Sequence, residues 1–195
     1  MIGSLRGLWR WVGVAFLAVT LTACVTPTRM TSTKGDEASF SRVGRFSLTV
    51  QEASGQTEAV QGGFSWLDED DRYALDLTNP LGSTQARVEG QAGFAVLTRA
   101  NGERIEASDP DALAEEALGS RIPVAGLRDW FQGRLAQAPQ AQSVQRDAEG
   151  RPTQFEQGGW RATLSRYDAL GPQMLVLERK EPGRVIRLRL VVNPA

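Results

Sequence analysis

The chain contains 195 residues, of which 41% are hydrophobic, with 22 basic and 23 acidic side chains and no histidine. This size is typical of a single domain with a substantial core, and so small a net charge argues against a nucleic-acid-binding protein. Without histidine the chain lacks the commonest general base and a usual zinc ligand, so we expect neither an enzyme with a Ser-His-Asp or Cys-His pair nor a zinc site.

The first 23 residues have the layout of a secretory signal peptide. Arg6 and Arg10 form a basic start, residues 11–19 form an apolar segment, and small residues precede Cys24. The apolar segment is shorter than the roughly 20 residues of a spanning helix. We therefore predict that residues 1–23 are removed, and an uncleaved membrane anchor is the alternative. Removal of both arginines leaves 20 basic and 23 acidic residues, a net charge of −3.

Cys24 is the only cysteine of the chain. A single cysteine in an exported protein cannot form an internal disulfide, so it is either a free thiol or a modified one. Its position resembles the lipobox of bacterial lipoproteins, which implies that Cys24 is acylated and begins the mature chain. Because Val25 follows, where many inner-membrane lipoproteins carry Asp, the resemblance also implies sorting to the outer membrane. Residues 24–40 are then the acylated cysteine and a flexible tether rich in Thr and Ser, and residues 41–195 are one domain.

From Val43 onward, apolar and polar residues alternate with a period of two, which is typical of strands with one apolar face. Short Gly- and Asp-rich joints, including Asn101-Gly102, indicate hairpins and therefore an antiparallel sheet. The acidic run 68–71 is interpreted as a solvated loop rather than as a carboxylate pair for catalysis or a calcium site. Strands of this first set are predicted at 43–50, around Phe64 and Trp66, and at 72–77, 83–90, 93–99 and 103–107.

A helical pattern follows these strands. Pro110 suits a first helical turn and Gly119 ends that helix, and a second short helix is predicted at 124–132. Strand patterns then return at 153–157, 159–167, 173–180 and 184–192. About ten to eleven antiparallel strands with a helical insertion describe a mainly β protein whose sheet is curved. The pattern alone does not distinguish an open half-barrel from a closed barrel.

Six segments, in order along the chain, resemble the family of the outer-membrane lipoprotein receptor LolB. The most specific is NPLG after a Tyr-x-Leu-x-Leu strand, followed by the Ile-Pro-Val, Leu and Trp pattern of the helices. Members often end in a Trp-containing tail, whereas this chain ends shortly after its last predicted strand. The six segments are GRFSLTV at 44–50, GGFSW at 62–66, RYALDLTNPLGST at 72–84, LGSRIPVAGLRDWFQG at 118–133, GWRATLSRY at 159–167 and IRLRL at 186–190.

The resemblance implies an incomplete antiparallel β-barrel with helices covering an apolar cavity. It also implies a receptor that accepts lipoproteins from the periplasmic carrier LolA and releases them into the inner leaflet of the outer membrane. The expected partners are LolA, the acyl chains of lipoproteins and the membrane that holds the N-terminal lipid, and we expect a monomer without cofactor, metal or catalytic residues. The alternatives are a passive structural lipoprotein or scaffold and a binder of another amphiphile, such as a phospholipid or lipopolysaccharide.

Two kinds of site residue are predicted from these expectations. Leu81 lies at the tip of an Asn-Pro turn, and we expect it to point outward and to serve delivery into the membrane, although it could fold back onto the sheet. The cavity is expected to be lined by large apolar side chains, any of which could instead belong to the plain core. The candidates are Phe46, Leu48, Phe64, Trp66, Leu75, Leu77, Phe94, Val96, Trp130, Trp160, Leu164, Met174, Val176, Ile186 and Leu188.

Overall fold

The computed structural model describes residues 39–118 and 122–194. Residues 35–195 form one compact unit, and the buried core of the described chain lies between Phe46 and Val192. Because a unit with its own core can fold independently, we expect residues 35–195 to fold without the preceding segment. The predicted signal peptide, Cys24 and most of the tether lie outside the described residues.

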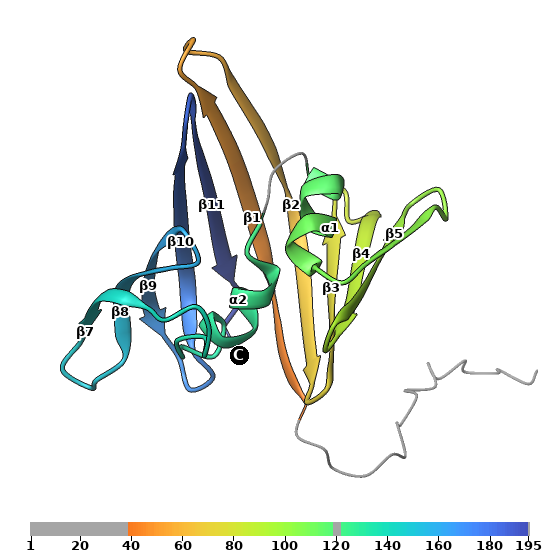
Figure 1. Cartoon of the computed structure of the whole chain (residues 1–195). Coiled ribbons are helices and arrows are strands. Elements are labelled where there is room, and N and C mark those ends of the chain that lie inside the picture. Colours follow the sequence, from red (N-terminus) through yellow and green to blue (C-terminus); the bar gives the residue numbers. More distant parts are fainter. Residues whose placement is uncertain (1–38, 119–121, 195) are drawn as a thin grey trace, which may run out of the picture. The chain divides into compact units, whose positions relative to one another are not determined.

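The described chain is mainly β, with a helical insertion in the middle, as the sequence predicts (Figure 1). The two helices are α1 (Pro110–Leu118) and α2 (Val124–Trp130). The eleven strands are β1 (Phe40–Glu52), β2 (Thr57–Glu69), β3 (Arg72–Thr78), β4 (Thr84–Gln91), β5 (Phe94–Arg99), β6 (Arg104–Ala107), β7 (Gln142–Arg146), β8 (Pro152–Gln157), β9 (Trp160–Tyr167), β10 (Pro172–Glu181) and β11 (Arg184–Val192).

All the strands of the described chain belong to one antiparallel sheet with the order β6-β5-β4-β3-β2-β1-β11-β10-β9-β8-β7. The order follows from consecutive hairpins on both sides of the β1–β11 pair, which joins the two ends of the chain at the centre of the sheet. The outermost strands, β6 and β7, do not pair with each other in this sheet. The sheet is therefore open, and the prediction of an incomplete barrel is confirmed.

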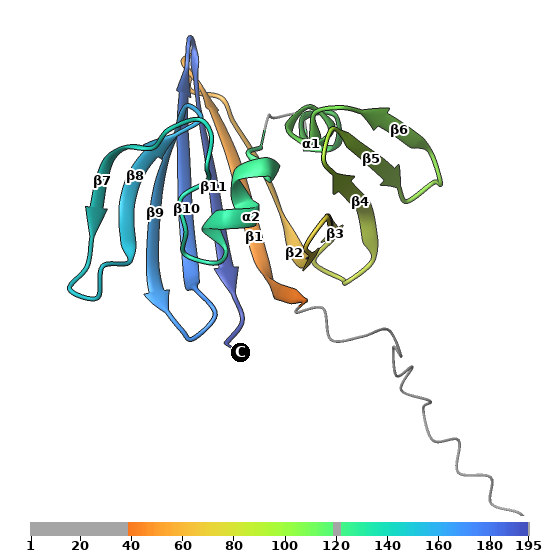
Figure 2. The same cartoon turned by 60° about the horizontal axis from the view of Figure 1, so that its bottom comes forward.

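The sheet curves around α2, which lies on its concave side (Figure 2). The ring of Phe131, directly after α2, is 5.4 Å from the ring of Phe64 in β2, and the ring of Trp130 is 5.5 Å from that of Phe155 in β8. In a flat sheet, β2 and β8 would be about 24 Å apart, at about 4.8 Å for each strand spacing. A single short helix can contact both strands only because the sheet is strongly bent. The other helix, α1, packs on β4, β5 and β6.

Two glycines mark the bend at the centre of the sheet. A Cβ atom on Gly44 would lie 2.2 Å from the carbonyl oxygen of Val191, and one on Gly62 would lie 1.9 Å from that of Thr78. No side chain fits at either position, so the close approach of the neighbouring backbones requires glycine.

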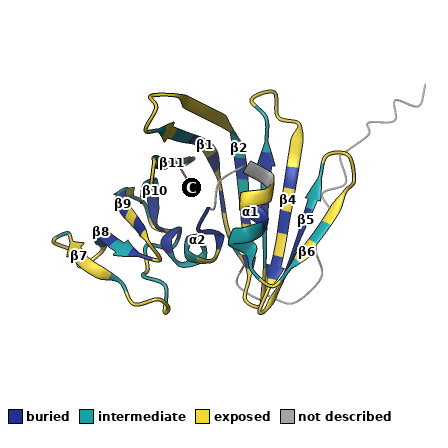
Figure 3. Cartoon of the chain, turned by 45° about the horizontal axis from the view of Figure 1, so that its top comes forward, coloured by how far each residue is buried: buried dark blue, intermediate teal, exposed yellow. Residues whose placement is uncertain are grey.

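Alternation of buried and exposed residues follows the strands closely, as Figure 3 shows along β4. Strand β7 was not predicted, because all five of its residues are exposed and its sequence has no apolar face. Strand β2 is also longer than predicted: it begins at Thr57, where five consecutive exposed residues hide the period of two.

Candidate functional site

The concave face of the sheet is an apolar surface covered by aromatic side chains. Trp66 of β2 stacks on Tyr73 at 5.2 Å and lies 5.6 Å from Phe131. Trp130, Phe155 and the residues just named form a continuous cluster with side chains from both arms of the sheet. The surface therefore has the chemistry expected of an acyl-binding face, and in this structure protein side chains occupy it.

Eleven of the fifteen predicted cavity residues belong to this buried cluster. Strand pairing explains their common direction, because residues directly opposite each other on neighbouring strands point to the same face. Phe46, for example, pairs with Leu190 across β1 and β11. The eleven are Phe46, Leu48, Phe64, Trp66, Leu75, Leu77, Trp130, Trp160, Leu164, Ile186 and Leu188.

The other four predicted cavity residues, Phe94, Val96, Met174 and Val176, lie outside the core cluster. Their strands alternate with the opposite phase: Ala95 and Leu97 of β5 and Leu175 and Leu177 of β10 are the residues buried in the core. A shift of one residue moves a whole apolar set to the other face of a sheet. These four residues are therefore withdrawn from the candidate lining.

A bidentate ion pair connects β2 to α2 at one end of the apolar face. Arg128 Nε donates to Asp68 Oδ2 at 2.9 Å, and its Nη2 donates to Asp68 Oδ1 at 2.8 Å. The hydrogen bond with Asp68 raises the pKa of Arg128 above its ordinary value. The Asp68 side chain is only 6% exposed, so the interpretation of residues 68–71 as a uniformly solvated loop was wrong for Asp68.

A buried cation, Arg42, lies near the same end of the apolar face. Arg42 of β1 donates from Nη1 to Asp168 Oδ2 at 2.9 Å and from Nη2 to the carbonyl oxygen of Pro172 at 3.0 Å. Burial acts to raise the pKa of Asp168, but hydrogen bonds from Arg42 and from the backbone N–H groups of Leu170 and Gly171 lower it overall. The two ion pairs make this end of the concave face polar.

Two buried donors on the same face have no hydrogen-bond partner among the described residues. They are Arg42 Nε and Trp66 Nε1, and Arg42 is directly opposite Trp66 in the β1–β2 pairing. Buried donors normally have a hydrogen-bond partner. These two N–H groups of the inner face are therefore donors that the hydrogen bonds among the described residues leave unused.

The apolar face is accessible at its other end, along the β1–β2 hairpin. Val60 of β2 pairs with Leu48 of β1 and therefore points to the same face, yet it is 44% exposed. Strand β3 pairs only with residues 63–69 of β2, so the first part of β2 extends beyond its neighbour. Figure 1 shows the β1–β2 and β10–β11 hairpins projecting past the two helices. The concave face is therefore exposed to solvent at this end, at Val60.

The Leu81 side chain is 92% exposed. Asn79 Oδ1 accepts hydrogen bonds from the N–H groups of Leu81 at 2.9 Å and Ser83 at 3.0 Å, and the Gly82 N–H donates to the Asn79 carbonyl oxygen at 2.9 Å. Gly82 has a φ of 88°, which glycine adopts without strain. The turn is thus held by its own hydrogen bonds and presents one large apolar side chain to solvent.

A buried amide fixes the segment after α2 to β8. Gln157 accepts hydrogen bonds from Trp130 Nε1 at 2.9 Å and from the Ala136 N–H at 3.1 Å. Its amide nitrogen donates to the carbonyl oxygens of Ala136 and Pro139, both at 2.7 Å. With its acceptor and donors all used, Gln157 holds Trp130 in the core in one orientation.

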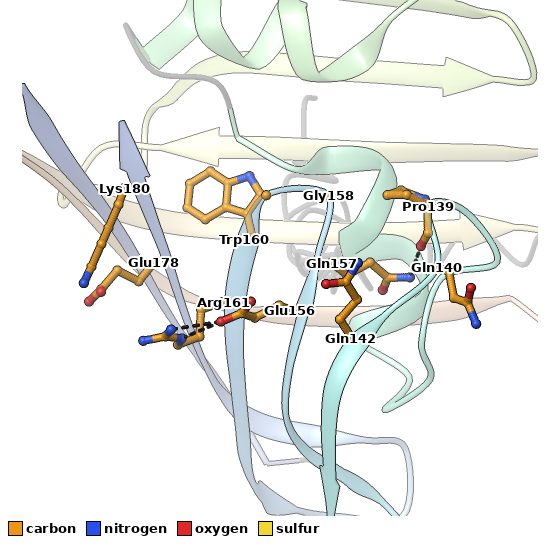
Figure 4. Close-up of a pocket in the computed structure, with 11 residues that line it drawn as sticks. Pro139, Gln140, Gln142, Glu156, Gln157, Gly158, Trp160, Arg161, Glu178 and Lys180 are labelled. Atoms are coloured by element: carbon orange, nitrogen blue, oxygen red, sulfur yellow. Dashed lines mark hydrogen bonds and ion pairs between the residues drawn. The ribbon is translucent and has the colours of Figure 1, made fainter. Parts of the chain in front are cut away.

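A hollow of about 410 Å³ lies next to this amide, and Figure 4 shows the residues that line it. Glu156, Arg161, Glu178 and Lys180 contribute to its lining, and Arg161 forms an ion pair with Glu156 at 2.9 Å. Such a polar lining is unsuited to an acyl chain, so we do not assign this hollow to the predicted cavity. Within the described part of the chain, no helix has the length and apolar character needed to cross a membrane.

Comparison with known proteins identifies the family. The family described as outer membrane lipoprotein LolB matches residues 38–194. The outer-membrane lipoprotein LolB of Bordetella bronchiseptica is 57% identical over 191 residues, covering 96% of each chain. The corresponding protein of Bordetella pertussis is 60% identical over 177 residues, covering 91% of this chain and 88% of its own, and that of Cupriavidus necator is 36% identical over 179 residues, covering 89% and 90%.

Among solved structures, a LolA superfamily protein from Nitrosomonas europaea has a TM-score of 0.43 and 11% identity, covering 80% of this chain and 87% of its own. The matches to LolB proteins confirm both the resemblance and the outer-membrane localisation that the sequence predicts. The chain belongs to the LolB family of outer-membrane lipoproteins.

Proposed function

We propose that this protein accepts lipoproteins from the periplasmic carrier LolA and releases them into the inner leaflet of the outer membrane. The observation that carries the proposal is a continuous apolar concave face that is exposed at Val60 and bounded at the other end by the ion pairs of Asp68 and Arg42. The acyl anchor predicted on Cys24 holds the body at the membrane where the cargo is released.

The energetics of the cargo explain the need for such a face. An acyl chain of roughly sixteen carbons, at about 0.8 kcal/mol per methylene, costs on the order of 12 kcal/mol when it is exposed to water. A receptor must therefore offer apolar surface at least as favourable as that of the carrier. The sequence has no nucleotide-binding loop, so the transfer runs downhill from carrier to receptor to bilayer.

Side chains occupy the concave face in this structure, so the acyl chains must displace some of them. The candidates to move are the aromatic residues contributed by α2 and its end, Trp130 and Phe131, since the strands beneath them are fixed by backbone pairing. An acyl chain that enters beside Val60 would take their place over Phe64 and Trp66. The two unpartnered donors, Arg42 Nε and Trp66 Nε1, lie at the far end of that path.

Leu81 is assigned to delivery rather than to capture. Burial of one leucine in lipid is worth about 1.5–3 kcal/mol, which is enough to orient the body at a bilayer without fixing it there. Leu81→Glu should therefore still take cargo from LolA but fail to pass it to vesicles.

The test follows a labelled lipoprotein from LolA to the purified receptor and then to liposomes. Leu170→Glu is the matched control, because Leu170 is a 45%-exposed leucine in the β9–β10 turn, and it should transfer cargo like the unaltered protein. If Leu81→Glu loses capture from LolA and delivery to liposomes to the same extent, the assignment of Leu81 to delivery alone is wrong. If residues 35–195 accept no cargo from the carrier, the proposed cavity in the body is wrong.

The filled concave face also suits a passive structural lipoprotein, whose core should stay closed. Native mass spectrometry after incubation with LolA-bound lipoprotein separates the two functions. The receptor should acquire the mass of the cargo, whereas a scaffold should keep its own mass.

A further inference from the structure

A groove of about 740 Å³ lies on the outer face of the sheet and begins at the Leu81 turn. Its walls come from the centre of the sheet, with Arg45 and Ser47 of β1 and Arg189 of β11, and from the turn, with Thr78 and Asn79. Pro80 and Gly82, on both sides of Leu81, also line it. The groove and the exposed leucine are therefore parts of one continuous surface.

Two arginines in this groove, Arg45 and Arg189, have no counter-ion among the described residues. Arg45 is opposite Val191 and Ser47 is opposite Arg189 in the β1–β11 pairing, so the two arginines are diagonal neighbours on one face, about 7–8 Å apart at their Cα atoms. Neither forms an ion pair or a hydrogen bond with the described residues. The described residues that line the groove include no carboxylate.

Two other outer-face arginines of the same sheet, Arg187 and Arg161, are paired. Arg187 binds Glu178 at 2.7 Å and Arg161 binds Glu156 at 2.9 Å. Two adjacent like charges without a partner repel each other, and an anion bound between them would remove that repulsion. The rest of the lining suits an oxyanion, because it supplies the hydroxyl groups of Ser47 and Thr78 and the amide of Asn79.

We propose that this groove binds the phosphate of an anionic phospholipid headgroup, with Arg45 and Arg189 as its ligands. Guanidinium groups match phosphate oxygens in bidentate geometry. The adjoining turn favours a lipid phosphate over a soluble one. When Leu81 enters the bilayer, the groove beside it lies at the level of the lipid headgroups. The inference rests on the proposed function only in that Leu81 meets a membrane, and it needs neither carrier nor cargo.

The test measures binding of residues 35–195 to vesicles of phosphatidylcholine alone and of phosphatidylcholine mixed with phosphatidylglycerol. At about 1 kcal/mol for each arginine near an anionic surface, Arg45→Gln should weaken binding to the mixed vesicles about fivefold. Arg45→Gln combined with Arg189→Gln should weaken it about thirtyfold. Binding to phosphatidylcholine alone should change little in either variant.

Arg104→Gln combined with Arg166→Gln is the matched control, because both residues are exposed, carry the same charge and have no ion pair with the described residues. This control should change vesicle binding by less than the single groove variant. Equal losses in the two double variants would overturn the proposal, since the attraction would then be general rather than local.

Soluble phosphate provides the remaining comparison. Inorganic phosphate and glycerol phosphate, at matched ionic strength, should compete only weakly with the mixed vesicles. If inorganic phosphate without lipid binds the groove as tightly as the mixed vesicles do, the lipid assignment is wrong.

A second experiment replaces the double variant if that variant does not fold. The unaltered protein is titrated with short-chain phosphatidylglycerol, and the guanidinium NMR signals of Arg45 and Arg189 are compared with that of Arg104. Signals that shift equally at all three positions would also overturn the proposal.

The vesicle-binding assays contain no lipoprotein, so a negative result in them does not contradict the proposed transfer function. In turn, a failed lipoprotein-transfer assay does not prevent the test of phospholipid binding in the groove.

Discussion

The bidentate pair between Asp68 and Arg128 is the polar connection between β2 and α2, and Asp68→Asn removes its charge with little change in size. The side chains are 6% and 34% exposed. Full burial would make the loss about 3–5 kcal/mol, but the partly exposed guanidinium can recover water. We therefore expect the free energy of unfolding to fall by about 2 kcal/mol, which corresponds to a melting temperature lower by about 4–8 °C for a domain of this size.

Asp76→Asn is the matched control, because Asp76 and Arg87 form a pair of the same geometry, with distances of 2.6 and 2.7 Å. These side chains are 23% and 50% exposed, and they join two neighbouring strands instead of a strand and a helix. Exposed pairs contribute about 0.2–1 kcal/mol, so this variant should lose less than 1 kcal/mol. Urea unfolding of both variants measures the difference. Equal losses would refute the view that burial makes the Asp68 pair the stronger one.

Two further predictions concern buried polar groups. Gln157→Leu leaves Trp130 Nε1 and nearby backbone groups without their partners, so urea unfolding should show a loss of about 3 kcal/mol, whereas Gln145→Leu on exposed β7 should stay within about 0.5 kcal/mol. Burial raises the pKa of Tyr73 and of Tyr167 to about 12. Because the pKa is higher in the folded state than in the unfolded state, the contribution of these tyrosines to the free energy of unfolding is complete below about pH 10. It is lost as the pH rises toward 12. Ultraviolet titration should therefore show no tyrosinate near pH 10 until the chain unfolds, and ionisation at pH 10 in the folded protein would contradict the burial of both rings.

The period of two was sufficient to predict most of the concave face, because strands with one buried face encode that face directly. Phe46 and Leu48 on β1, for instance, are separated by a polar residue and are both buried. The same signal failed on β5 and β10, where apolar residues occupy both faces. There the phase is decided by pairing with β4 and β11, which a single segment does not reveal.

The polar parts of the site were harder to predict. Arg42 is in phase with Phe46 on β1, so its position on the inner face could have been recognised, but its partner Asp168 is 126 residues away. Asp68 looked like the first residue of a solvated acidic run, and only the position of α2 shows that Arg128 covers it. Long-range ion pairs have no local pattern, so such residues become visible only in the folded chain.

The attachment of α2 indicates how the concave face could be freed. Its apolar side chains, Val124, Leu127 and Trp130, together with Phe131 at its end, account for about 6–12 kcal/mol at about 1.5–3 kcal/mol each. If the proposed function holds, one acyl chain of roughly sixteen carbons supplies a similar amount, so bound cargo would replace α2 over the sheet at little net cost. The polar contacts of Asp68 and Gln157 can exchange with water, since a hydrogen bond contributes only about 0.5–1.5 kcal/mol net.

Hydrogen exchange tests this displacement. The amide of Leu127, bonded to Pro123, and that of Phe131, bonded to Leu127, should exchange faster when the receptor carries lipoprotein. The amides of Leu48 and Leu188 lie in the central β1–β11 pair and should keep their protection, because the strands beneath the ligand do not separate. If α2 stays as protected as the central strands in the loaded receptor, the acyl chains do not take its place, and they must bind on a surface other than the one that Trp130 covers.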